Sequence, residues 1–144
     1  MRLGKLRKDV LKQSSVVMLL LFALLVFGCA PVIKAPPQAY SPIPETHPVL
    51  LVNGALPPSV QYATIGPLEV RLPPPGNVAA FDKVRGILAT EARKVGANAV
   101  IQVSTKYAWT ISGWTTFGAG MAIRLPDDRV EQVAAMPHVQ EEWR

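Results

Sequence analysis

Side chains able to do catalytic or metal chemistry are few and scattered in this 144-residue chain, which has one cysteine and two histidines. Nucleophilic catalysis needs a base beside an activated Ser, Thr or Cys. His47 precedes Pro48 and His138 follows Pro137, so neither is expected on a rigid element. No group of Cys, His and carboxylates has the spacing of metal ligands. We therefore predict no catalytic residue, no metal site and no cofactor beyond a covalent lipid.

Other pairs and glycine runs have simpler interpretations. Paired carboxylates can perform acid–base catalysis, but Asp127-Asp128 resembles a helix cap and Glu141-Glu142 lies in a polar tail. Gly118-Ala119-Gly120 lies inside an expected strand with no helix after it, which argues against a phosphate loop. An enzyme is thus the least favoured class.

The single cysteine, Cys29, follows a three-part N-terminal segment. Residues 1–28 carry five Lys/Arg and one Asp (5 − 1 = +4), whereas the rest carries ten Lys/Arg and nine Asp/Glu (10 − 9 = +1). The basic residues precede an apolar run, Val16–Phe27, as in an export signal. That run is shorter than the roughly 20 residues that span a bilayer. Because the positive charge is confined to this segment, the basic composition does not indicate a nucleic-acid partner.

Val26-Phe27-Gly28-Cys29 resembles the lipobox of bacterial lipoproteins, with Phe27 larger than usual. The resemblance implies removal of the signal peptide 1–28, diacylglycerol on the Cys29 sulfur and acylation of the new N-terminus, which together form a stable anchor. The alternative is an uncleaved anchor that extends through 30–33 and buries the cysteine. Both place the remainder outside the cytoplasm. Ala30, where inner-membrane lipoproteins usually carry Asp, favours the outer membrane facing the periplasm in a Gram-negative host.

Residues 29–59 are predicted to form a lipid-anchored, proline-rich linker. Twelve of the fourteen prolines lie between positions 31 and 75, and proline fixes φ and removes an N–H donor. An extended, semi-rigid spacer is therefore expected. The apolar patch Val49–Val52 would end the linker earlier if it packs on the domain.

Residues 60–126 are predicted to form the folded domain. VQYATIGPLEVRL indicates a strand with a bulge or bend at Gly66-Pro67. Asn77 precedes a helical pattern that ends at Gly96, a preferred C-cap residue. The apolar residues of this pattern recur at helical spacing: Phe81, Val84, Leu88, Ala92 and Val95. Residues 127–144 are predicted to form a short helix, with Asp127 or Asp128 and Glu131 in a capping box, followed by a tail.

The last two strands of the domain are expected to pair as a hairpin. Odd positions are apolar on both, with Ile101, Val103, Tyr107 and Trp109 on one strand and Phe117, Ala119, Met121 and Ile123 on the other. These sets share a face only if the loop has an odd number of residues. We therefore predict the three-residue loop 111–113, with Thr110 opposite Trp114 and Tyr107 and Trp109 toward the core.

The expected fold class is α+β, a small antiparallel sheet of about three strands in the order β-α-β-β with one helix on a face. A core of about 66 residues is marginal, so further burial must come from the tail, the 49–52 patch or a second copy. Trp114, Gly118, Gly120 and Ala122 are interpreted as a smooth, solvent-facing strip that could serve as an interaction surface. Alternatively, glycine there only relieves crowding.

These segments resemble the YbjQ-like superfamily, which includes ring-forming proteins and the sensor domain of the Rcs envelope-stress lipoprotein. The resemblance covers about residues 60–125 and rests on Ile65-Gly66, Gly96–Ile101 and the small residues at 118, 120 and 122. It implies envelope-stress sensing as one role. The Rcs sensor is disulfide-bonded, which one cysteine cannot reproduce. Some members are labelled heavy-metal binders, but this chain lacks suitable ligands.

The sequence thus favours a lipid-anchored, non-enzymatic protein of the cell envelope. It would act as a binding or sensing module through contacts with an envelope protein or with itself, and would have no nucleic-acid partner. The alternative is a small-ligand or metal-binding module, formed between subunits of an oligomer.

Overall fold

The computed structural model describes residues 30–136 and the backbone of 141–143. The predicted signal segment 1–28, the predicted lipidation site Cys29 and His138 lie outside the described residues. Pro31 begins the compact unit that contains the sheet.

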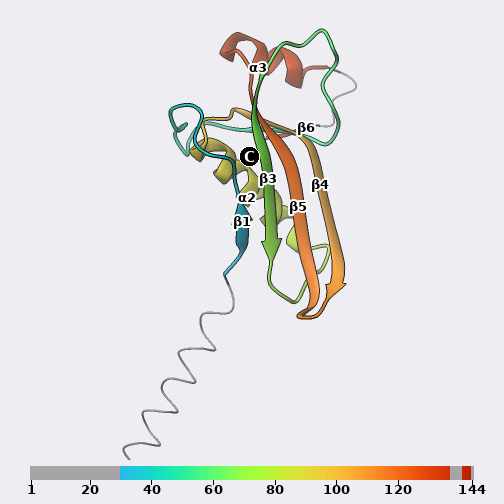
Figure 1. Ribbon diagram of the computed structural model, residues 1–144. Helices are drawn as coiled ribbons and strands as arrows, with labels where there is room; N and C mark the ends of the chain where they lie inside the picture. Colours follow the sequence, from blue (N-terminus) through green and yellow to red (C-terminus); the bar gives the residue numbers. More distant parts are fainter. Residues whose placement is uncertain (1–29, 137–140, 144) are drawn as a thin grey trace, which may run out of the picture. The chain divides into compact units, whose positions relative to one another are not determined.

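Five strands form a mixed sheet in the order β1-β3-β5-β4-β2, and the short strand β6 extends it at the β2 edge. Figure 1 shows β1, β3, β5 and β4 side by side in this order. The strands are β1 (Val32–Lys34), β2 (Leu50–Val52), β3 (Ala63–Leu72), β4 (Ala99–Thr110), β5 (Gly113–Arg124) and β6 (Glu141–Trp143). The β2–β4 pair is parallel and the other pairs are antiparallel. The predicted three-stranded antiparallel sheet with one helix is therefore wrong.

The extra strands β1 and β2 come from the predicted linker. The strand β1 fits between Pro31 and the pair Pro36-Pro37, on the sheet edge where proline is tolerated. The strand β2 lies inside the sheet, and Val49–Val52 are at most 1% exposed, which confirms that this patch packs on the domain. Residues 29–59 are therefore not an extended spacer throughout. The density of prolines predicts a linker, but strands of three residues fit between the prolines and leave the composition unchanged.

The helix α2 (Ala80–Lys94) covers one face of the sheet and packs on β3, β4 and β5. The expected apolar stripe is confirmed, because Val84, Leu88 and Ala92 are fully buried. The Ala80 N–H donates to Asn77 Oδ1 at 3.0 Å. At the other end Gly96 has φ +80°, a left-handed conformation that favours glycine.

Small residues on β5 let α2 approach the sheet closely. A Cβ added to Gly118 would overlap Val84 Cγ1 of the helix, and one added to Gly120 would lie 2.5 Å from Val100 Cγ1. Ala122 is fully buried. The prediction that Gly118, Gly120 and Ala122 form a solvent-facing strip is therefore wrong. The alternative interpretation, glycine relieving crowding, fits this packing.

A second core lies on the other face, at the end of the sheet where β4 begins. The helix α3 (Asp127–Ala134) contributes Val130 and Val133 to it. Its sheet side includes Leu50, Val52, Ala99, Ile101, Ile123 and Leu125. The predicted Asp cap is absent, since Pro126 occupies the N-cap position without a side-chain hydrogen bond. The short helix itself forms as expected.

Buried Asn98 joins the start of β4 to the end of β5. Its Nδ2 donates to Leu125 O at 2.8 Å, and its Oδ1 accepts from Leu125 N–H at 2.8 Å. Because Asn98 is 1% exposed, these bonds satisfy groups that would be costly to bury alone.

The β4–β5 hairpin has a two-residue turn, so the predicted three-residue loop is wrong. Thr110 pairs with Gly113 and Trp109 with Trp114. A bulge between Ile101 and Ser104 shifts the register by one residue, and Gln102 within it has φ +54°. Ile101 therefore pairs with Met121 on the α3 side, while Val103 joins the core under α2. The bulge, and not the turn, therefore lets odd-numbered residues face odd-numbered residues at the start of β4.

We expect Gly118→Ala to destabilise the fold by about 1–3 kcal/mol, because the new methyl group overpacks the interface with Val84. Adding Val84→Ala should recover part of this loss. Gly86→Ala on α2 is the matched control: its Cβ meets nothing within 4 Å, so it should stabilise by about 0.5–1 kcal/mol. Denaturant unfolding measures all three. Equal effects of the two glycine substitutions would contradict this packing.

Candidate functional site

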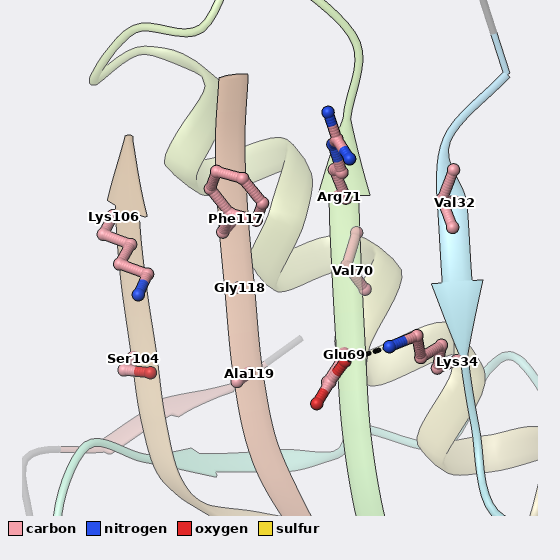
Figure 2. A pocket seen from close by; sticks show the side chains of 10 residues that line it. All are labelled: Val32, Lys34, Glu69, Val70, Arg71, Ser104, Lys106, Phe117, Gly118 and Ala119. Atoms are coloured by element: carbon pink, nitrogen blue, oxygen red, sulfur yellow. Dashed lines mark ion pairs between the residues drawn. The ribbon is translucent and has the colours of Figure 1, made fainter. Parts of the chain in front are cut away.

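A hollow of about 430 Å³ lies on the sheet face opposite α2, in the part that α3 does not cover. Four strands supply its side chains in two registered rows (Figure 2). One row is Lys106, Phe117, Arg71 and Val32, and the other is Ser104, Ala119, Glu69 and Lys34. Strand alternation sends the neighbours Leu68, Val70 and Leu72 into the α2 core. The hollow is therefore built on a backbone that the core holds from behind.

Positive charge dominates the hollow. Three cationic residues, Lys34, Arg71 and Lys106, line it together with a single carboxylate, Glu69. Lys34 Nζ lies 3.1 Å from Glu69 Oε2, with both side chains more than half exposed, so this ion pair contributes little to stability. Arg71 Cζ lies 5.6 Å from the Phe117 ring centroid, a cation–π geometry that holds the guanidinium over the floor. The arrangement suits an anionic group beside an apolar contact.

Among the residues that line the hollow, the carboxylate that could act as a base is Glu69, and it is paired with Lys34. Ser104 supplies a hydroxyl, but no histidine accompanies it there. His47 lies in the segment before β2, where its backbone carbonyl accepts from Arg93 Nε at 2.8 Å. No group of three or more His, Cys, Asp or Glu suited to a metal gathers within the described residues. Likewise, no described helix is long and apolar enough to cross a membrane.

The predicted surface residues do not form one site. Trp114 is 48% exposed and contacts Tyr107 on the α2 side, away from the hollow. Gly118 contributes to the hollow only as part of its floor. The prediction that Tyr107 and Trp109 face the core is wrong: they are 45% and 69% exposed. Tyr107 contacts Phe81 in the first turn of α2, so Trp109 lies beyond the end of the helix.

The cationic residues of the hollow were missed because each comes from a different strand. A local signal existed in β3, where Glu69 and Arg71 alternate with buried residues and so mark a polar face. Lys34 gave no such signal, because its strand was assigned to a linker. Lys106 was missed because it follows the bulge, and the bulge changes the face of the sheet on which Lys106 lies.

No protein-family model, curated protein or solved structure matches this chain. The resemblance to the YbjQ-like superfamily thus stays a prediction.

We expect the combined change Lys34→Ala, Arg71→Ala and Lys106→Ala to alter the free energy of unfolding by no more than about 1 kcal/mol, because exposed charge pairs contribute little. Leu68→Ala on β3 is the matched control: Leu68 is 1% exposed, so its truncation should cost about 2–5 kcal/mol. Denaturant midpoints compare the two. A large loss from the triple variant would show that these cations hold the fold together.

Proposed function

We propose that this chain is a lipid-anchored, non-enzymatic protein of the cell envelope that binds a partner protein through the hollow on its sheet. The observation that carries this proposal is the three-to-one excess of cations over carboxylates around Phe117. Arginine can bind a carboxylate bidentately, and Lys34 and Lys106 lie on either side of it in the sheet order. An acidic segment of an envelope protein is the partner that this chemistry favours.

The anchor in this proposal is the lipid on Cys29. It is supported by the order of basic residues, apolar run, Gly28 and Cys29. The start of the sheet at Val32, shortly after this motif, is compatible with cleavage before Cys29, since the compact unit that contains the sheet begins at Pro31. Ala30 favours the outer membrane, facing the periplasm. Envelope-stress sensing, which the family resemblance implies, is one role that such a binding module would fill.

A small anionic ligand is the second candidate, favoured by one observation. The volume of about 430 Å³ falls in the range of small-molecule sites. A ligand of this kind would use the same cations. The first candidate predicts that a protein co-purifies with this chain from the envelope, and the second predicts that a small molecule does.

We expect Cys29→Ser to keep residues 1–28 and to lack lipid, because a hydroxyl cannot form the thioether with diacylglycerol. Intact mass of the membrane-extracted protein measures both changes. The neighbouring substitution Ala30→Asp is the matched control: it should retain the lipid and move the protein to the inner membrane. A wild-type protein with a free thiol at position 29 in the cytosolic fraction would contradict the anchor.

We expect a photoreactive residue at Ser104 to crosslink to a partner protein in intact envelopes, whereas one at Lys83, exposed on α2 across the sheet, should not. Charge reversal at Lys34, Arg71 and Lys106 together should abolish the adduct, because it repels an acidic segment. Lys83→Glu is the matched reversal and should leave it intact. Native mass spectrometry of the extracted protein tests the alternative. A bound small anion without a protein adduct would favour the small-ligand candidate.

A further inference from the structure

Two uncharged segments meet at the end of the sheet where the β4–β5 hairpin turns. Residues 72–81 and 107–117 contain no Asp, Glu, Lys, Arg or His. A hydrogen bond from Gly76 N–H to Trp114 O joins them, and Thr116 Oγ1 accepts from Asn77 N–H at 3.2 Å. This end, called here the apolar tip, thus combines the turn of the hairpin and the loop before α2.

Large apolar side chains of the tip are exposed to solvent. Ile111 at the turn is fully exposed, Trp109 is 69% exposed and Val78 is 61% exposed. Exposed apolar groups gathered in one place mark binding sites for proteins or membranes.

The aromatic residues of the tip are already ordered by contacts with one another. The Trp109 and Trp114 rings meet edge to face with centroids 5.7 Å apart, and Tyr107 lies 5.5 Å from Trp114. Phe81 of α2 continues the series 6.2 Å from Tyr107. Contact with an apolar phase would therefore cost little side-chain ordering.

The chain enters the sheet from the tip end, shortly after the proposed lipidation site. Val32 lies in register with Arg71, Phe117 and Lys106. From this row β4 extends four residues further, to Thr110, which is roughly 13 Å. Because β1 is antiparallel to β3, the chain enters β1 from the end where β3 finishes, which is the tip end. Two residues, Ala30 and Pro31, lie between Cys29 and Val32, so three residue steps limit that distance to about 10 Å.

We propose that the apolar tip enters the interface of the phospholipid bilayer beside the lipid anchor, with Ile111 deepest and Trp109 at the headgroup level. This inference rests on the proposed lipidation of Cys29. Tryptophan suits this position because its ring is apolar and its indole N–H can bond to water or headgroups. Because both tip segments lack charge, entry carries no cost of desolvating an ionised side chain.

The membrane is favoured over a second copy or a partner protein because of where the tip lies. A lipid on Cys29 brings the bilayer to this end of the sheet, within the reach of three residues, whatever else binds. Exposed Trp and Ile held there would meet lipid first. A second contact also adds to the acyl chains, since membrane attachment strengthens when more than one element engages.

The test measures the depth of single tryptophans in the full lipidated protein. The protein is reconstituted in vesicles of phosphatidylcholine and phosphatidylglycerol, with matched vesicles that carry brominated acyl chains. One variant keeps only Trp109 (Trp114→Phe, Trp143→Phe). The control keeps only Trp143 (Trp109→Phe, Trp114→Phe), whose backbone is in register with Leu50 and hence with Ala99, at the far end of β4. The 12 residues of β4 separate the two ends by roughly 35 Å.

We expect brominated lipid to quench the emission of Trp109 and to leave that of Trp143 unchanged. Adding Ile111→Ser to the Trp109 variant should weaken the quenching, and circular dichroism should show an unchanged fold, because Ile111 has no burial to lose.

Each other outcome overturns the inference at an identifiable step. Lipid on Cys29 by intact mass, with Trp109 unquenched, would remove the tip contact and leave the anchor standing. Absence of lipid on Cys29 would remove both. Quenching of both tryptophans would contradict the orientation. A blue-shifted, unquenched Trp109 together with crosslinks between copies would assign the tip to self-association instead.

Discussion

The bulge in β4 is the constraint on which both faces of this sheet depend. Gln102 adopts a left-handed φ of +54° without being glycine, and its N–H donates to Gly54 O at 2.9 Å. That bond ties the bulge to the loop after β2, which helps to close the second core through Leu56. Before the bulge, Ile101 packs toward α3; after it, Val103 packs under α2. Because of the inserted residue, Ile101 and Val103 pack on opposite faces of the sheet.

The same shift decides what each face presents to solvent. Beyond the bulge, Ser104 and Lys106 join the hollow, while Tyr107 and Trp109 continue the α2 side past the end of the helix. Glycine at position 118 then lets Val84 sit against the sheet. Val84 of α2 thus packs behind Gly118, which is part of the floor of the hollow. The bulge thus places Lys106 on the cationic face and Trp109 at the apolar tip.

Local patterns predicted the elements that have local causes. The stripe of α2, the left-handed Gly96 and the register shift near Gly66 all follow from periodicity or from single residues. The failures have non-local causes. The strand β1 exists because it pairs with β3, and nothing in Val32–Lys34 distinguishes it from a proline-rich spacer. The bulge contains no glycine that would have indicated it in the sequence. Alternation of apolar residues without a bulge predicts a three-residue loop, which is wrong. It also places the small residues of β5 on the solvent face. Of the four predicted surface residues, Trp114 alone is exposed by more than a third.

Loss of the long spacer changes what the proposed anchor can do. A spacer of thirty extended residues would have let the domain search for partners far from the bilayer. With β1 beginning at Val32, a lipid on Cys29 would instead hold the sheet at the membrane surface. The hollow includes the row of Val32, roughly 13 Å from the hairpin turn. A partner that reaches Arg71 and Lys106 must then present its acidic segment close to the bilayer. Such a geometry selects membrane-bound partners before any chemical recognition takes place.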